Sequence, residues 1–251
     1  MSGVGVATFR FYQELNDFLP PERRKRSIPY EFEISPSVKD AIESLGVPHV
    51  EVDVIVVDGQ SVGFDHRLRN GDRVAVYPIF ETLDVSPIVR LRPEPLRRTT
   101  FIADVHLRKL ARLLRLLGFD TLHSNAFEDE EIAEAARRER RIILTRDRQL
   151  LKRGSVTRGY WVRSTEPVEQ AREVVRRFDL SERAEPLTRC PTCNGALERV
   201  KKEEVLAEIP PKTAAWLDEY YRCASCKKLY WRGTHAKRLD DLVDRICSNR
   251  R

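Results

Sequence analysis

The sequence predicts an α/β chain made of three parts, and three observations lead to this prediction. Alternating β-like segments surround one helical segment in the first 85 residues, regular strand–helix repeats begin at residue 99, and two CxxC pairs follow residue 183. With 251 residues, 41% of them hydrophobic, the chain can bury more than one small core. We expect domains at 1–85, 99–182 and 183–251, the last including a C-terminal tail, and a linker at 86–98.

The N-terminal part has the order strand, strand, helix, strand, strand. Ser37 is a favourable helix cap and Gly46 ends the helical pattern. The predicted strands are 6–12, 30–34, 52–57 and 73–77, and the helix is 38–45. This order is similar to the ubiquitin-like β-grasp fold of small sulfur carriers. Because the chain continues beyond residue 77 without a free Gly-Gly end, carrier chemistry is excluded, and we expect a protein-contact, RNA-presenting or purely structural role.

Strands and helices alternate from residue 99. Leucines between Leu107 and Leu117 recur at helical spacing after the apolar run 100–103, and Gly118 ends the pattern. Further strands are expected at 121–123, 141–145 and 160–163, and further helices at 128–140, 147–153 and 167–178. Repeated units of this kind build a parallel sheet with helices on both faces.

Carboxylates follow two of these strands. Asp104 directly follows the first strand, and Asp147 follows a later one with one residue between. Because ligands bind at the carboxyl edge of a parallel sheet, we expect both carboxylates to lie close together at that edge. Three more acids begin the helix at 128–140, and the sequence leaves open which of them points inward: Asp129, Glu130 and Glu131. Such hard oxygen donors suit Mg²⁺ or Mn²⁺, which would relieve the repulsion between the carboxylates.

A divalent metal site of this kind predicts phosphodiester hydrolysis. Two ions about 4 Å apart can activate a water and stabilise the leaving oxygen. Arg146, beside Asp147, could neutralise charge on the reacting phosphate or tether the substrate. The structural alternative is that each Asp caps a helix and that the acids at 128–131 stabilise a first helical turn. The occurrence of several such carboxylates together favours the metal site.

Basic residues are concentrated in the later part of the chain. Residues 1–97 hold 12 basic and 15 acidic side chains, and residues 98–251 hold 33 and 24, so the net charges are −3 and +9. This distribution predicts that a polyanion binds beyond residue 97, although a basic surface that contacts only solvent would give the same charge distribution. The expected RNA contacts are Arg108, Lys109 and Arg112 on the first helix and Lys227, Lys228, Tyr230, Trp231, Arg232 and His235 near the C-terminus. Tyr230 and Trp231 could equally pack within the C-terminal domain.

Four of the five cysteines form two CxxC pairs. Cys190 and Cys193 are separated from Cys223 and Cys226 by 29 residues, and each pair can present two thiolates to a tetrahedral zinc. We expect a structural zinc ribbon with an added helix between the pairs, and a redox dithiol is the weaker alternative. Cys247 remains as a free thiol near the C-terminus.

The segments FIADVHLRKLARLLRLLGFDT and EDEEIAEAARRERRIILTRDRQLLKR, followed by the two CxxC pairs, resemble the Mut-seven C-terminal RNase family. The resemblance covers about residues 98–240 and implies a PIN-like nuclease fold with a fused zinc ribbon. Bacterial members with a ubiquitin-like N-terminal domain are similar over nearly the whole chain. By this resemblance Asp104, Asp129 and Asp147 occupy the positions of metal-binding acids, and Glu130 is the residue most easily confused with Asp129.

The function expected from these features is hydrolysis of RNA, with tRNA or messenger RNA as candidate substrates. Zinc is expected as a structural cofactor and Mg²⁺ or Mn²⁺ as the catalytic one. The alternatives are a non-catalytic RNA-binding adaptor that uses the zinc ribbon and basic face, and a scaffold built on the ubiquitin-like domain with a protein partner. With no signal peptide or apolar stretch long enough for a bilayer, we expect a cytoplasmic protein without membrane contact.

Overall fold

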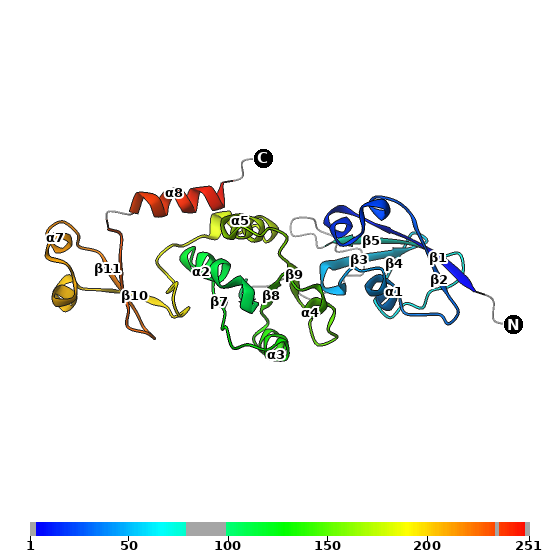
Figure 1. Ribbon diagram of the computed structural model, residues 1–251, viewed down its shortest axis with the longest axis horizontal. Coiled ribbons are helices and arrows are strands. Elements are labelled where there is room, and N and C mark those ends of the chain that lie inside the picture. The colour runs from blue at the N-terminus through cyan, green and yellow to red at the C-terminus, as the bar shows by residue number, and fades with distance from the viewer. Residues whose placement is uncertain (1–3, 79–98, 234–235, 249–251) are drawn as a thin grey trace. The chain divides into compact units, whose positions relative to one another are not determined.

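The computed structural model describes residues 4–78, 99–233 and 236–248. The chain divides into two compact units (Figure 1). The N-terminal unit comprises residues up to 97 together with Asp147–Tyr160, and the C-terminal unit comprises residues 98–146 together with Trp161–Arg251. The predicted linker at 86–98 lies outside the described residues. No helix in the described part of the chain is both long and apolar enough to cross a membrane.

The N-terminal unit contains a mixed five-stranded sheet with the order β2-β1-β5-β3-β4. β1 is antiparallel to β2 and parallel to β5, which is the arrangement expected for a β-grasp fold. The strands are β1 (Gly5–Phe11), β2 (Ile28–Phe32), β3 (Val52–Val57), β4 (Gln60–Val62) and β5 (Arg73–Pro78). Buried and more exposed residues alternate along β1 and β5, so one face of the sheet forms the core.

Helix α1 (Val38–Ser44) begins and ends where the sequence predicts. The Ser37 side chain accepts a hydrogen bond from the Asp40 N–H at 3.1 Å, and Gly46 adopts a φ of +107° after the last turn. The long connection after β1 contains short 3₁₀ helices at Gln13–Phe18 and Pro21–Arg23, and another, η3 (His49–Glu51), precedes β3. Strand β4 was not predicted, because three residues after a tight turn show no alternation.

A second sheet has four strands in the order β7-β6-β8-β9, and β6 is parallel to both β7 and β8. The parallel α/β prediction is therefore confirmed. The strands are β6 (Phe101–Ala103), β7 (Thr121–Leu122), β8 (Ile142–Thr145) and β9 (Gly159–Trp161). The helices that follow its strands are α2 (Arg108–Leu116), α3 (Asp129–Glu139), α4 (Arg148–Lys152) and α5 (Pro167–Arg177), and a 3₁₀ turn, η4 (Val105–Leu107), precedes α2. Of these helices, α4 belongs to the N-terminal unit.

The strand order places helices on both faces of this sheet. The chain moves from the central strand β6 to β7 on one side through α2, and then back past β6 to β8 through α3. Because such crossovers are right-handed, two crossovers in opposite directions put their helices on opposite faces. Figure 1 shows α3 on the far side of the strands from α2 and α5, and α2 packs against α5.

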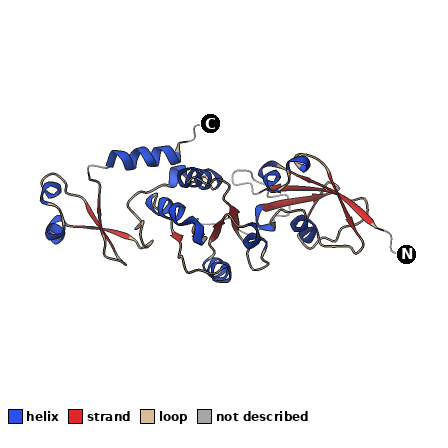
Figure 2. Cartoon of the chain, in the orientation of Figure 1, coloured by secondary structure: helices blue, strands red, loops and turns tan. Residues whose placement is uncertain are grey.

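The region after α5 forms a small antiparallel sheet, β10-β11-β12 (Figure 2). Its strands are β10 (Leu197–Val200), β11 (Tyr220–Cys223) and β12 (Leu229–Trp231). Two short helices, α6 (Lys202–Val205) and α7 (Pro211–Ala214), occupy the long connection between the CxxC pairs, where the sequence predicted one helix. The predicted tail instead contains helix α8 (Ala236–Cys247), which packs against α5.

Candidate functional site

Asp104 lies at the carboxyl end of β6, as the sequence predicts. Its N–H donates to the Leu144 carbonyl at 2.9 Å, so the β6–β8 ladder continues to this residue. The carboxylate is 5% exposed and accepts a 2.7 Å hydrogen bond from the Thr145 hydroxyl at the end of the neighbouring strand β8. Thr145 is fully buried, and sequence reasoning missed it. A buried carboxylate is therefore held at the strand ends by a fixed donor.

The acids at the start of α3 have different surroundings. Glu128 and Glu131 form a reciprocal capping box, which accounts for both as helix-stabilising residues. Between them, Asp129 is partly buried and Glu130 is exposed. The Glu131 side chain therefore caps the start of the helix. Of the other two predicted acids, Asp129 is less exposed than Glu130.

Asp147 and Arg146 follow β8. The exposed Asp147 caps α4 and accepts a hydrogen bond from the Gln149 N–H at 2.7 Å. In this structure Asp147 therefore has the helix-capping role that the sequence analysis gave as the alternative to metal binding. The Arg146 guanidinium donates to the carbonyls of Arg163 and Ser164 at 2.7 and 2.5 Å. These contacts favour a structural role for Arg146 in holding the loop after β9.

Only the four CxxC cysteines, among the residues described, form a group of three or more candidate ligands whose atoms all lie within 4.8 Å of one another. The carboxylates predicted to hold Mg²⁺ or Mn²⁺ do not form such a group. The hydrogen bonds of Asp104 and Asp147 to Thr145 and the Gln149 N–H give each carboxylate a separate partner.

A basic cavity of about 390 Å³ lies along α2 in the C-terminal unit. Its lining contains no acidic side chain and consists of Arg108, Lys109, Arg112, Arg115, His123, Pro191, Thr192 and Lys228. Arg108, Arg112 and Arg115 are spaced at i, i+4 and i+7, so they share one helix face over about 10 Å. The structure thus brings four predicted RNA contacts, from α2 and from beside the second CxxC pair, to one cavity. A polyanion is the ligand whose charge this lining matches.

His123 connects this cavity with Asp104. Its Nε2 atom lies 3.2 Å from the carbonyl of Val105, the residue after Asp104. Burial lowers the pKa of His123 below its usual value and outweighs the Asp104 carboxylate, which acts in the opposite direction. A neutral imidazole therefore lies close to the buried carboxylate. His123 was not predicted as a site residue, because it lies in a segment that the sequence explains as a strand.

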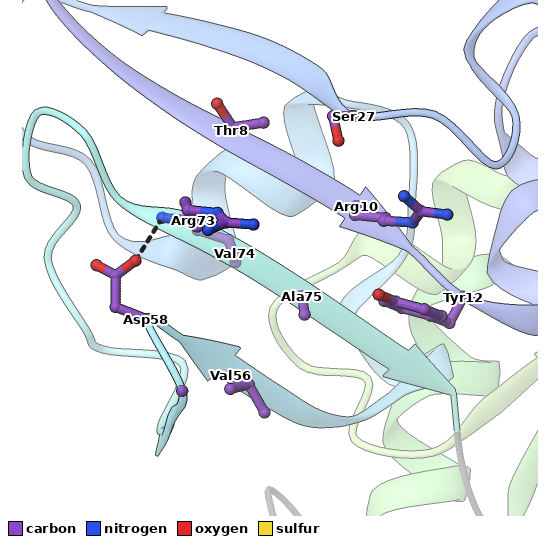
Figure 3. A pocket seen from close by; sticks show the side chains of 10 residues that line it. Thr8, Arg10, Tyr12, Ser27, Val56, Asp58, Arg73, Val74 and Ala75 are labelled. Carbon is purple, nitrogen blue, oxygen red and sulfur yellow. Dashed lines mark hydrogen bonds between the residues drawn. The ribbon is translucent and has the colours of Figure 1, made fainter.

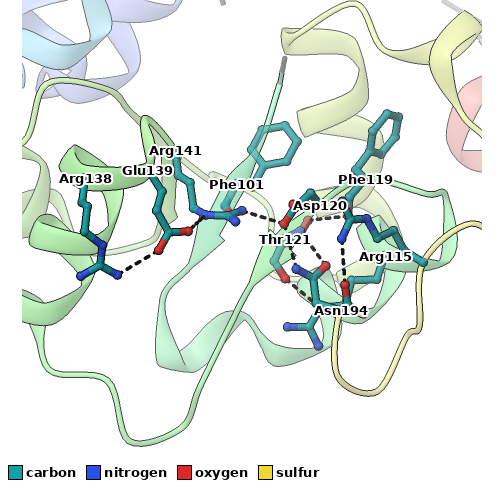
Figure 4. A network of polar contacts seen from close by, with 10 residues as sticks. Phe101, Arg115, Phe119, Asp120, Thr121, Arg138, Glu139, Arg141 and Asn194 are labelled. Carbon is teal, nitrogen blue, oxygen red and sulfur yellow. Dashed lines mark hydrogen bonds and ion pairs between the residues drawn. The ribbon is translucent and has the colours of Figure 1, made fainter. Parts of the chain in front are cut away.

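Asp120 is the centre of a polar network that joins the sheet to the first CxxC loop (Figure 4). Its carboxylate accepts hydrogen bonds from Arg141 at 2.7 Å and Asn194 at 2.8 Å, and it pairs with Arg189 at 3.1 Å. Burial alone would raise the pKa of Asp120, but these donors outweigh burial and hold the pKa below its usual value. Arg115 also joins the two parts by donating to the Thr192 carbonyl at 3.1 Å. The cysteine loop is thus attached to the sheet by partly buried charged groups.

The four cysteines have the geometry of a structural zinc site. A tetrahedron of sulfurs about 2.3 Å from a zinc has edges of about 3.8 Å. Cys190 Sγ lies 3.7 Å from Cys226 Sγ, and Cys193 Sγ lies 3.4 Å from Cys223 Sγ. The donor set and its spacing are compatible with zinc.

The aromatic residues after the second CxxC pair contribute to packing. The Tyr230 hydroxyl lies 3.0 Å from Cys190 Sγ and 3.1 Å from the Thr192 hydroxyl. Trp231 packs against Tyr220 in the small core of this domain. These positions favour the packing alternative stated for both residues.

The neighbouring cations have different surroundings. Arg232 pairs with Asp240, and Lys227 donates to the Ala224 carbonyl at 2.7 Å. Lys228, by contrast, lines the basic cavity. His235 lies outside the described residues.

A separate cavity of about 520 Å³ lies on the N-terminal sheet (Figure 3). Arg10 and Tyr12 from β1 and its end, and Arg73 from β5, line it together with Asp58, which accepts a 3.2 Å hydrogen bond from the Arg73 N–H. It contains none of the predicted site residues and mixes both signs of charge, in contrast to the cavity along α2.

Two family models match the chain. The Mut7-C RNAse domain matches residues 99–243, and the Mut7-C ubiquitin domain matches residues 4–84. Searches of curated proteins and of solved structures found no match to this chain. The RNAse match covers more than half of the chain and includes Asp104, the α2 cavity and all four CxxC cysteines. The chain therefore belongs to the Mut7-C RNAse domain family, in the arrangement with an N-terminal Mut7-C ubiquitin domain.

Proposed function

We propose that the protein is a metal-dependent ribonuclease that hydrolyses phosphodiester bonds in single-stranded RNA. The observation that carries this proposal is the acid-free basic cavity along α2, next to the buried carboxylate of Asp104 at the strand ends. Membership of an RNase domain family supports the same reaction class. An adaptor that only binds RNA would use the cavity but would have no need of a buried, hydrogen-bonded carboxylate beside it.

The chain supplies both halves of such a site. Arg108, Lys109, Arg112 and Lys228 bind successive phosphates and hold the RNA backbone along α2. We assign Mg²⁺ or Mn²⁺ binding to Asp104, Asp129 and Asp147, with Glu130 as the neighbouring carboxylate on α3. A divalent cation held by these carboxylates would stabilise the negative charge that builds up on the phosphate during hydrolysis. The hydrogen bond from the Thr145 hydroxyl holds the Asp104 carboxylate in one orientation.

The zinc ribbon has a structural role in this proposal. The four thiolates leave no open ligand position, so zinc held there stabilises the fold and takes no part in the reaction. The first CxxC loop forms one wall of the basic cavity through Pro191 and Thr192. Zinc binding therefore shapes the surface that holds the RNA.

The test is cleavage of a labelled single-stranded RNA while Mg²⁺ or Mn²⁺ is titrated into protein that holds zinc and no other divalent ion. We expect cleavage that rises with the divalent ion and stops with excess chelator, while zinc remains bound. RNA binding without cleavage at any Mg²⁺ or Mn²⁺ concentration would contradict the proposal and favour the adaptor. A double-stranded RNA of the same sequence is the matched substrate control.

A further inference from the structure

One cation of the basic cavity differs from the four that hold the RNA backbone in the proposed function. Arg115 is only 6% exposed, whereas Arg108, Lys109, Arg112 and Lys228 are exposed. All five side chains line the same cavity in the C-terminal unit, and its lining contains no acidic side chain. The cavity therefore combines four cations at the surface with one buried guanidinium that the proposed backbone contacts do not use.

The Arg115 guanidinium is held in one orientation by two backbone carbonyls. Its Nε atom donates to the Thr121 carbonyl at 2.8 Å (Figure 4), and its Nη1 atom donates to the Thr192 carbonyl at 3.1 Å. In the described part of the chain the Nη2 atom has no hydrogen-bond partner, and it is not sealed from solvent. Because Arg115 lines the cavity, a fixed guanidinium presents its remaining donors to a ligand there.

The charge of Arg115 is not paired with a carboxylate in the described residues. Asp120, the acid in the neighbouring polar network, forms its ion pairs with Arg141 and Arg189 instead. Burial lowers the pKa of Arg115, and the charges of the first CxxC pair and of Asp120 act in the opposite direction. A buried cation is costly without a counter-charge at hydrogen-bond distance, so an anion in the cavity would stabilise this arrangement.

The size of the cavity fits the end of an RNA strand better than a continuous stretch of it. Its volume of about 390 Å³ is at the low end of the range of about 300–1,000 Å³ for small-ligand pockets. An internal phosphodiester carries a nucleoside on each side and a single negative charge. A terminal phosphate monoester carries a nucleoside on one side only, has three acceptor oxygens and holds a charge of about −1.5 to −2 at pH 7. The end group is therefore the part of the strand that can reach a buried guanidinium.

We propose that the basic cavity binds the terminal phosphate monoester of a single-stranded RNA, and that Arg115 is the residue that selects this end group. This inference rests on the proposed function, because it takes RNA as the ligand. The exposed cations hold the backbone next to the end, and Arg115 donates from Nη2 to an oxygen of the terminal phosphate. The substrate class is then RNA with a phosphorylated end, and the 5′ and 3′ ends present the same chemical group.

The test measures equilibrium binding of short RNAs to the full, zinc-loaded chain without added Mg²⁺ or Mn²⁺, so that binding is separated from cleavage. Three RNAs of one sequence, labelled on an internal base, carry a 5′-phosphate, a 3′-phosphate or hydroxyls at both ends. A further RNA with hydroxyl ends is one nucleotide longer, which adds one phosphate charge in an internal position. We expect a phosphorylated RNA to bind about ten-fold or more tightly than both hydroxyl-ended RNAs, and the preferred RNA identifies the end that is bound.

Matched variants separate contact with the phosphate from loosening of the first CxxC loop. Arg115→Gln should abolish the preference for the phosphorylated end. Asn194→Gly removes the bonds to Asp120 at 2.8 Å and to the Thr121 N–H at 3.0 Å, which join the same loop to the sheet, and should keep the preference. Asn194 has a φ of +69°, which glycine adopts without strain. Arg112→Gln should weaken binding of all the RNAs by a similar factor, and zinc content is measured in each variant.

The unaltered chain decides whether the end group is recognised, whatever the variants do. Equal binding of phosphorylated and hydroxyl-ended RNAs would overturn the end-binding site. A preference that survives in Arg115→Gln, or that is lost equally in Asn194→Gly, would overturn the assignment to Arg115. Preference for a phosphorylated end without cleavage after Mg²⁺ or Mn²⁺ is added would contradict the ribonuclease and support the end-binding site, and cleavage without any end preference would do the reverse.

Discussion

The hydroxyl of Thr145 donates a 2.7 Å hydrogen bond to the carboxylate of Asp104, joining the carboxyl ends of the neighbouring strands β8 and β6. Both side chains are buried, and the parallel register pairs Ala103 with Leu144, so each residue directly follows a paired position. The contact orients a carboxylate that would otherwise lose its solvation without compensation.

We predict that Thr145→Val reduces RNA cleavage about ten-fold while leaving RNA affinity unchanged, because it frees Asp104 without altering the basic cavity. Thr145→Ser keeps the hydroxyl and should retain most activity. The measurements are single-turnover cleavage rates and equilibrium RNA binding at one salt concentration. Equal loss of activity in both variants would show that the hydroxyl is not responsible.

We predict that Arg112→Gln weakens binding of single-stranded RNA similarly for all sequences. Loss of one phosphate contact should reduce the slope of log affinity against log salt by about 0.7. Arg137→Gln removes the same charge from the exposed last turn of α3, outside the cavity, and should leave the slope unchanged. If both substitutions have the same effect, binding depends on net charge and not on the cavity.

We predict one tightly bound zinc per chain, lost in Cys223→Ser. Cys223 is buried at the end of β11, so loss of the ion should expose residues 190–231 to proteolysis. Cys247→Ser is the matched control, since this partly buried cysteine belongs to α8 and not to the cluster. Elemental analysis gives the zinc content, and full zinc retention in Cys223→Ser would reject the site.

We predict that Asp120→Asn lowers the free energy of unfolding at pH 7 by about 2 kcal/mol, because Arg141 and Arg189 lose a largely buried anion. The folded-state pKa of Asp120 is depressed, so its contribution is present in full well above the ordinary value of 3.8 and is lost as pH falls below it. The difference between the two proteins should therefore shrink between pH 5 and pH 2, as measured by urea unfolding. The exposed Asp218, replaced by Asn, should change stability little at either pH.

Periodicity and turn chemistry were sufficient to predict most elements of the fold. Strand β3 has the predicted bounds, and α1, α3 and α5 lie within two residues of theirs. Helix α8 was missed because the end of the chain was taken as a tail, although Leu239, Leu242, Val243 and Ile246 recur at helical spacing.

The parts of the site that could not be predicted depend on tertiary contacts. The sequence places Asp104 after a strand, but only the sheet order brings Thr145 beside it. Likewise, α4 follows a strand of the C-terminal sheet along the chain but packs with the ubiquitin-like domain, and no local pattern distinguishes these two partners. The basic stripe on α2 was visible, whereas its closure into a cavity by Thr192 and Lys228 was not.

The most direct test of the account compares RNA cleavage and RNA binding in Asp104→Asn, Asp129→Asn and Asp147→Asn with those of the unaltered chain. Each substitution removes one proposed metal-binding carboxylate and leaves the basic cavity intact. We predict that cleavage in Mg²⁺ or Mn²⁺ falls at least about a hundred-fold in Asp104→Asn while RNA affinity is retained. Cleavage at the unaltered rate in Asp104→Asn would contradict the account.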